Sequence, residues 1–206
     1  LLFVDGATGI RVRPTTTMAT AAPGKPKSLL VKMTGACDIA CDYCYDYDAA
    51  RWKGRTDLAL VRRLIRESLV PGQRLTIMFH GGEPLLQFAA IRELVVFAEG
   101  EAEAVGAEVR FTLQTNGMRL GPDVVEFLCA HPFGVGVSLD GPAHVHDLHR
   151  VDHRGRGTFE RLARKFEEFP EFMRERVGYI SVATQRNIAF LEDTWTFFRE
   201  QGVLSW

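Results

Sequence analysis

Short apolar segments alternate with longer amphipathic segments along this chain. Val109, Phe111 and Leu113 alternate as in a strand, whereas the apolar residues between positions 56 and 70 recur at helical spacing. On this pattern we expect strands at residues 28–34, 74–80, 108–115, 133–140 and 177–184. We expect helices at residues 56–70, 84–104, 121–130, 158–169 and 187–202. The last residues, 203–206, look like the opening of a sixth strand.

The regular exchange of strand and helix predicts an α/β fold built on a parallel sheet with right-handed crossovers. A complete eightfold barrel typically needs about 250 residues, which is more than the 206 residues present here. We therefore predict a partial (β/α)6 barrel that is truncated at the sixth strand, with a doubly wound sheet as the alternative. In both architectures the chemistry lies at the carboxyl ends of the strands.

Composition and charge exclude some classes of partner. With 206 residues and 46% hydrophobic residues, the chain can form one domain with a full core. Its formal net charge of −1 gives no general attraction to nucleic acid or to an acidic membrane surface. No apolar run approaches the length of a membrane span, and the first residues lack the pattern of a secretory signal. We therefore expect a cytoplasmic protein that binds neither nucleic acid nor membranes.

A flexible leader is expected before the first strand. The sequence opens on Leu1, and Met18 is followed by a stretch rich in Ala, Pro and Gly that resembles a natural start. We expect residues 1–27 to form this leader, outside the folded core. Residues 28–206 then form one domain that is incomplete at its C-terminal end.

Four polar or glycine-rich motifs follow four consecutive predicted strands. A loop with three cysteines follows the first strand, HGGEP follows the second, QTNG ends the third and SLDGP ends the fourth. The carboxyl ends of parallel strands meet on one rim of a barrel. We therefore expect the four motifs to share one site.

Cys37, Cys41 and Cys44 lie in the first of these loops at the spacing C-x3-C-x2-C. Because cytoplasmic thiols stay reduced, a metal site is favoured over a disulfide. Zinc is one interpretation, but zinc sites usually pair cysteines and complete four ligands, here with His80 as the candidate fourth. Inert buried thiols are a second interpretation, which the neighbouring aspartates disfavour. The third is an iron–sulfur cluster on three thiolates, which leaves one iron open for a small molecule.

The segment CDIACDYC, with Tyr43 as its aromatic residue, resembles the signature of the radical SAM enzymes, and GGEP after the second strand strengthens the resemblance. The resemblance implies that the three cysteines hold a [4Fe–4S] cluster and that S-adenosylmethionine binds its open iron beside Tyr43. It also implies reductive cleavage to methionine and a 5′-deoxyadenosyl radical, which removes a hydrogen atom from a substrate. The electron then comes from a reduced flavodoxin- or ferredoxin-type donor.

The resemblance also assigns two rim motifs to the cofactor. The segment with Gly81, Gly82 and Glu83 binds the methionine ammonium in that family. Glycines followed by a proline also suit a plain turn from strand to helix. At the next strand end, Gln114 and Asn116 either reach the cofactor or belong to an Asn-Gly turn.

The end of the fourth predicted strand offers Ser138 and Asp140. In radical SAM enzymes the polar residue at this place contacts the ribose or the carboxylate of the cofactor. Alternation with Val137 and Leu139 points Ser138 toward the barrel interior, which makes it the better candidate. Asp140 is the second candidate, and its plainer role is to start a turn.

Residues 141–157 contain four of the six histidines, and we favour a mobile polar loop over a second metal site. The order DGP, HD, Arg150 and then glycines resembles the anaerobic sulfatase-maturating enzymes and related SPASM-type peptide maturases. This resemblance implies that the substrate is a peptide or protein side chain. It also implies that Arg150 contacts the cofactor or an anion of the substrate.

Some features leave alternatives open. The maturases usually carry a C-terminal extension with auxiliary clusters, whereas the one further cysteine here, Cys129, is expected to be a buried structural thiol. Asp38 and Asp42 are expected to be solvated, and as a hypothesis they make the cluster harder to reduce. No catalytic acid or base is identified. The alternatives are a radical SAM enzyme acting on a small metabolite, and a truncated, inactive scaffold that binds a precursor peptide.

Overall fold

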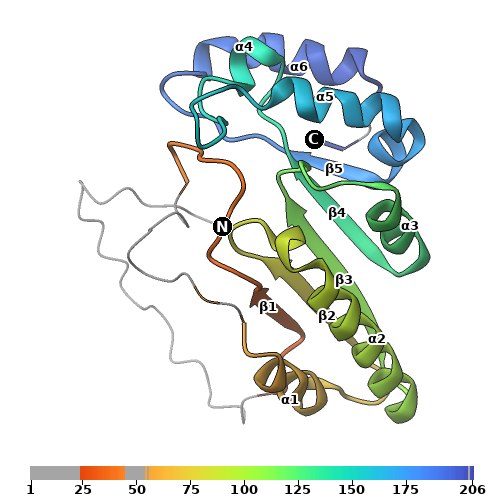
Figure 1. The fold of residues 1–206 in the computed structure, drawn as a ribbon. Coiled ribbons are helices and arrows are strands. Elements are labelled where there is room, and N and C mark those ends of the chain that lie inside the picture. Colours follow the sequence, from red (N-terminus) through yellow and green to blue (C-terminus); the bar gives the residue numbers. More distant parts are fainter. Residues whose placement is uncertain (1–23, 45–53, 55, 204) are drawn as a thin grey trace, which may run out of the picture.

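The computed structural model describes residues 24–44, 54, 56–203 and 205–206, and Figure 1 shows the course of the chain. Most of the expected leader lies outside the described residues, so the leader stays a prediction. Its described end contacts the body of the protein. The Lys27 carbonyl accepts a hydrogen bond from the Thr76 backbone N–H at 3.0 Å, and Lys25 Nζ donates to the Leu69 carbonyl at 3.1 Å.

In the described part of the chain, five parallel strands form one sheet, and their order in space is their order in the sequence. The strands are β1 (Ser28–Lys32), β2 (Arg74–His80), β3 (Glu108–Thr115), β4 (Phe133–Ser138) and β5 (Val177–Ile180). A doubly wound sheet reverses its strand order part-way along. The sequential order therefore confirms the partial barrel and excludes the doubly wound alternative.

The end of the chain lies beside the last strand. The described residues contain no sixth strand. The Ser205 carbonyl accepts a hydrogen bond from the Tyr179 backbone N–H at 2.9 Å. This contact places the end of the chain on the free edge of β5, where the next strand of such a barrel would pair.

Helices follow the strands at the predicted places, and one further short helix lies within residues 141–157, where a loop was expected (Figure 1). They are α1 (Leu58–Ser68), α2 (Phe88–Val105), α3 (Pro122–Ala130), α4 (Ala143–His146), α5 (Phe159–Glu168) and α6 (Leu191–Glu200). Short 3₁₀ turns at Pro84–Gln87 and Ile188–Phe190 precede α2 and α6, and a π turn at Phe172–Arg176 precedes β5. Within the described ranges, no helix is both long and apolar enough to cross a membrane.

Local sequence explains where these helices begin and end. Asp57 caps α1, because its side chain accepts hydrogen bonds from the backbone N–H groups of Ala59 and Leu60. Gly106 ends α2 in the left-handed conformation, with φ at 69°, which glycine adopts without strain. Pro122 occupies the first turn of α3, where its missing N–H costs nothing.

The two faces of the sheet differ in burial. Alternate strand residues on the helix side are buried in the core: Leu75, Ile77, Phe79, Phe111, Leu113, Val135 and Val137. The rings of Phe79, Phe111 and Phe133 pack together with centroids 5.2–6.2 Å apart, and burying each contributes about 1.5–3 kcal/mol. The other face carries half-buried polar residues such as Gln114 and Ser138, so it is the face that a barrel turns inward.

Cys129 is exposed, so the expectation of a buried structural thiol is wrong. The helix α3 buries Val124 and Leu128. Position 129 lies about 100° around the helix from position 128, which turns its side chain away from the core.

Candidate functional site

The loop that carries the three cysteines begins just after β1 and is held from two sides. The Glu83 backbone N–H donates to the Ala36 carbonyl at 2.8 Å, which ties the loop to the end of β2. On the other side, Ala40 N–H donates to the Val151 carbonyl at 2.7 Å. In Figure 1 the orange cysteine loop accordingly lies beside the teal segment that follows β4. The rim predicted from the motif order is therefore assembled by backbone hydrogen bonds.

Cys37 and Cys41 are half-buried and Cys44 is exposed, and all three are free thiols. Burial raises the pKa of Cys37 to about 12 and that of Cys41 to about 11. Both are therefore protonated at neutral pH, and a metal must displace their protons on binding. Among the described residues, no three His, Cys, Asp or Glu side chains are already arranged around one metal position. The donor set, three cysteines within eight positions, is the set that an iron–sulfur cluster takes.

Two of the thiols have a neighbouring donor. Asn116 Nδ2 lies 3.7 Å from Cys37 Sγ, within the range of an N–H···S hydrogen bond. Burial is the larger influence on Cys41, and the nearby charge of the Arg150 guanidinium acts in the opposite direction, to lower its pKa. Donors of this kind stabilise a thiolate. They therefore fit a thiolate-ligated metal group better than inert, buried thiols.

The two glycines of GGEP bring the end of β2 against the cysteine loop. Gly81 has φ at 87° and Gly82 has φ at 52°, and both angles are ones that other residues rarely adopt. A Cβ on Gly82 would overlap the Ala36 carbonyl, and one on Gly81 would overlap the Lys32 side chain. The close approach of the two segments therefore requires glycine at both positions.

The carboxylate of Glu83 is fully buried and satisfied by protein donors. Oε1 accepts from Leu85 N–H at 3.0 Å and from Thr115 Oγ1 at 2.8 Å, and Oε2 accepts from Asn116 N–H at 2.8 Å. Burial, partly opposed by these hydrogen bonds, raises the pKa of Glu83 to about 7. The side chain thus joins the end of β2 to the end of β3, which leaves the backbone carbonyls of this segment as its candidates for binding a cation.

Gln114 and Ser138 meet on the inner face of the sheet. Gln114 Nε2 donates to Ser138 Oγ at 3.0 Å. Both neighbours of Ser138, Val137 and Leu139, are buried on the opposite side, as the alternation predicts. Gly136 lies opposite Gln114 in the neighbouring strand, and a Cβ there would overlap the Gln114 amide. Because glycine has no side chain, position 136 leaves space for the Gln114 amide on the inner face.

Asp140 is the centre of a buried hydrogen-bond network. Its carboxylate accepts from Tyr43 Oη at 2.6 Å, from Arg150 Nε at 3.0 Å and from Val182 N–H at 3.0 Å. Arg150 also lies over the ring of Tyr43, 5.3 Å from its centroid. Burial and the charge of Asp140 raise the pKa of Tyr43, which therefore stays protonated. The network holds the cysteine loop against the ends of β4 and β5.

The segment 141–157 is not the mobile polar loop that the sequence suggested. It contains the short helix α4, and its residues His146, His149 and Arg150 are buried. His146 Nδ1 accepts from Asp140 N–H at 3.3 Å, which leaves Nε2 to donate to Thr158 Oγ1 at 3.1 Å. Burial lowers the pKa of His146 to about 3, so its ring is neutral. His146 and His149 are therefore buried, hydrogen-bonded residues, whereas His144 and His153 are exposed.

Asp38 and Asp42 are paired rather than simply solvated, which corrects the expectation from sequence. Asp38 accepts from Arg119 Nε at 3.0 Å and from Asn116 Nδ2 at 2.8 Å. Asp42 accepts from Arg186 Nη1 at 2.7 Å, and its other oxygen lies 2.5 Å from His149 Nδ1. These partners reduce the negative charge that the two aspartates would otherwise place beside the thiols.

Arg119, His149, Thr184 and Arg186 were not predicted as site residues. Thr184 Oγ1 lies 2.8 Å from His149 Nε2, which completes the link from the cysteine loop to the segment after β5. The partners are far apart in sequence: Asp42 and Arg186 are 144 positions apart. No local motif signals such a pair. The one available clue was that these residues follow the ends of β3, β4 and β5.

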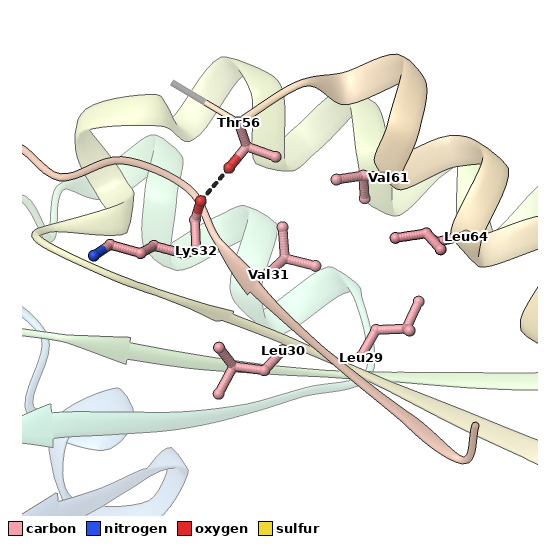
Figure 2. Close-up of a pocket in the computed structure, with 7 residues that line it drawn as sticks. All are labelled: Leu29, Leu30, Val31, Lys32, Thr56, Val61 and Leu64. Atoms are coloured by element: carbon pink, nitrogen blue, oxygen red, sulfur yellow. Dashed lines mark hydrogen bonds between the residues drawn. The ribbon is translucent and has the colours of Figure 1, made fainter. Parts of the chain in front are cut away.

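A pocket of about 270 Å³ lies elsewhere, between β1 and α1. Figure 2 shows its lining of Leu29, Leu30, Val31, Lys32, Thr56, Val61 and Leu64, with Thr56 Oγ1 donating to the Lys32 carbonyl. The lining is mostly apolar and contains none of the cysteines or rim residues described above. This pocket is therefore a separate feature of the sheet edge.

A comparison with protein families finds one profile that covers the motifs at the strand ends. The profile of the Radical SAM superfamily matches residues 31–185. Those residues contain the three cysteines, GGEP, and the polar ends of β3 and β4.

Among curated proteins, the cysteine-type anaerobic sulfatase-maturating enzyme of Clostridium perfringens is 27% identical over 183 residues, which is 85% of this chain and 49% of that enzyme. The serine-type enzyme of Klebsiella aerogenes is 31% identical over 144 residues, 68% of this chain and 36% of that enzyme. The chain thus spans about half or less of the length of these relatives.

Solved structures give the same likeness. The structure of anSMEcpe with bound AdoMet and the Kp18Cys peptide superposes with a TM-score of 0.76 at 26% identity, covering 86% of this chain and 49% of that one. The structure of Streptococcus suis SuiB bound to its precursor peptide SuiA has a TM-score of 0.62 at 17% identity, covering 86% of this chain and 38% of that one. The second likeness concerns the fold alone.

Proposed function

The chain belongs to the radical SAM superfamily, and we propose that it carries the radical-forming site of a peptide-modifying maturase. The enzymes of this superfamily use a [4Fe–4S] cluster and S-adenosylmethionine. Cys37, Cys41 and Cys44 hold the cluster in this proposal. When bound, the cluster and S-adenosylmethionine supply an organic radical that removes a hydrogen atom from a substrate. The observation that carries the proposal is the placement of the thiols on the rim formed by the strand ends, with the Asn116 amide directed at Cys37 and the Arg150 charge near Cys41.

The remaining rim residues then bind and orient the cofactor. The backbone carbonyls of the segment 81–83 accept the methionine ammonium, because the Glu83 carboxylate is already satisfied within the protein. Gln114 and Ser138 offer an amide and a hydroxyl on the inner face for the ribose or the carboxylate. The hydrogen bond between Gln114 and Ser138 holds both side chains in position until a ligand binds and replaces that hydrogen bond.

Three further residues, Tyr43, Asp140 and Arg150, shape the site around the cysteines in this proposal. Tyr43 forms a wall beside the cysteines, and Asp140 fixes its hydroxyl. Arg150 presents its guanidinium to Cys41 while Asp140 neutralises its charge. Tyr43 and Arg150 can therefore contact the cofactor, whereas Asp140, with no exposed side-chain surface, acts through them.

We propose a peptide or protein side chain as the substrate. Two similar proteins are named as cysteine-type and serine-type sulfatase-maturating enzymes, and one solved structure of a similar protein contains a peptide. The electron donor we propose is a reduced flavodoxin or ferredoxin. A cytoplasmic location is proposed on the ground that three reduced thiols are needed to assemble the site.

The test of this function uses the full-length protein, reconstituted anaerobically with iron and sulfide and then reduced. It is incubated with S-adenosylmethionine and peptides that contain cysteine or serine deuterated at Cβ. We expect deuterium in the 5′-deoxyadenosine that forms, and a mass change in the peptide. The matched control is the same peptide with alanine in place of the deuterated residue.

The two parts of the proposal fail separately in this experiment. If 5′-deoxyadenosine forms at the same rate with both peptides and carries no deuterium from either, the peptide substrate is wrong and a small metabolite becomes the better candidate. If no 5′-deoxyadenosine forms although the cluster is present and reduced, the proposed enzymatic activity itself is wrong. A protein that binds zinc and assembles no cluster would likewise contradict the proposed activity.

A further inference from the structure

Asn116 is held in one orientation at the end of β3, and every polar group of its side chain has a protein partner. The residue is only 8% exposed. Its backbone N–H donates to Glu83, and its Oδ1 accepts from the Met118 backbone N–H at 2.9 Å. These two contacts fix which end of the amide faces the cysteine loop. The Nδ2 group therefore points toward Asp38 and Cys37, at 2.8 Å and 3.7 Å respectively.

Two N–H bonds on Nδ2 are enough for both acceptors. Asp38 is held independently by Arg119, whose Nε lies 3.0 Å from Oδ2. Asn116 is thus not required to neutralise Asp38, and its distinct contact is the one with sulfur. Hydrogen bonds to cysteine sulfur are among the features that set the reduction potential of an iron–sulfur cluster.

We propose that Asn116 is a positioning residue that directs one N–H to the Cys37 thiolate and so makes the cluster easier to reduce. The inference rests on the proposed function, because it needs a cluster on Cys37. An N–H dipole aimed at the sulfur favours the more negative, reduced state over the oxidised state. The role differs from the contact with S-adenosylmethionine that the sequence suggested for Asn116.

The test measures the midpoint potential of the cluster by anaerobic redox titration, followed by electron paramagnetic resonance of the reduced state. Asn116→Ala removes the donor, and we expect a more negative potential and a smaller reduced signal at a fixed potential of the solution. Asn116→Ser is the second variant, because its hydroxyl can still accept from Met118 N–H but is too short to reach Cys37. We expect the same direction of shift from both.

Arg119→Gln is the matched control, since it breaks the ion pair with Asp38 and leaves the Asn116–Cys37 contact in place. Its potential should shift less than in the two Asn116 variants, because Arg119 is half-exposed and contacts Asp38 rather than the thiol. An unchanged potential in both Asn116 variants, at full iron content, overturns the inference and leaves the proposed function standing. An equal shift in Arg119→Gln also overturns it, because the effect then comes from Asp38 or from the loop as a whole. A wild-type protein without any cluster overturns the proposed function and this inference together.

Discussion

Arg150 and Asp140 form a buried ion pair with two contacts, Nε to Oδ2 at 3.0 Å and Nη2 to Oδ1 at 3.2 Å. Their side chains are 7% and 0% exposed. The same carboxylate accepts from Tyr43 Oη, so the pair also fixes the aromatic residue between Cys41 and Cys44. One buried carboxylate therefore connects the cysteine loop with the end of β4.

Replacing Arg150 should destabilise the protein strongly. Arg150→Met leaves the Asp140 charge buried without its partner, and the expected loss is about 3–5 kcal/mol in the free energy of unfolding. Arg150→Lys keeps a charge but not the two-pronged contact, so its loss should be smaller. Urea unfolding of the metal-free protein measures both. A loss under about 1 kcal/mol for Arg150→Met would show that the ion pair is not formed as described.

Gly82 and Gly72 form a matched pair of sites for substitution by alanine. Both have positive φ, at 52° and 72°. An alanine at 72 meets open space and should cost only the left-handed strain of about 1–2 kcal/mol. An alanine at 82 also overlaps the Ala36 carbonyl. We expect Gly82→Ala to lower the free energy of unfolding clearly more than Gly72→Ala does, and to retain less iron after reconstitution. Equal losses of stability in the two variants would count against the close approach of GGEP to the cysteine loop.

His149 and Arg186 both hold Asp42, yet their substitution should have unequal effects. His149 is buried between Asp42 and Thr184, and His149→Ala removes two hydrogen bonds and leaves a gap, at a cost of about 1–3 kcal/mol. Arg186 is more than half exposed, so Arg186→Gln should change stability by about 0–1 kcal/mol. Urea unfolding and the iron bound per chain report on both. The reverse order of effects would contradict the described link.

The buried neutral ring of His146 predicts a loss of stability in mild acid. Burial lowers its pKa from 6.5 to about 3. Between these two values the unfolded chain binds a proton and the folded protein does not, so unfolding becomes easier as the pH falls. The slope is at most about 1.4 kcal/mol per pH unit for this one group.

The measurement compares His146→Gln with the wild-type protein at pH 7 and pH 5. We expect the variant to lose less stability on acidification. His153→Gln is the control, because it removes an exposed histidine of the same segment. If His146→Gln and the wild type lose the same amount, His146 is not buried in its neutral form.

The sequence predicted the architecture well because the period of the apolar positions is a local property. β2 and β3 were predicted to the residue, and the parallel sheet followed from alternation with helices. The strand order was left open between two architectures and comes from the structure. The shortening of β5 was not predicted. Its apolar pattern continues past Ile180, whereas Ser181 and Val182 turn to hydrogen-bond with Leu139 and Asp140. The end of β5 therefore depends on tertiary hydrogen bonds, which the local pattern of apolar residues does not reveal.

The candidate site was predictable only in part for the same reason. Cysteine spacing and GGEP are local motifs, and they identified the rim. The buried positions of His146 and Arg150 were missed because a polar segment looks exposed until its partner, Asp140, is placed next to it. The side chain of Glu83 was linked to a cation by resemblance, and the structure shows it satisfied by three protein donors.

The proposed function requires that Cys37, Cys41 and Cys44 together hold a cluster that cleaves S-adenosylmethionine. The most direct measurement is the amount of 5′-deoxyadenosine and methionine formed by the anaerobically reconstituted, reduced protein, and by its three single Cys→Ala variants, with Cys129→Ala as control. We predict equal amounts of both products from the wild type and from Cys129→Ala, and none from the other three variants. Product formation by any one of those three variants, or none by the wild type with its cluster reduced, would contradict the claim.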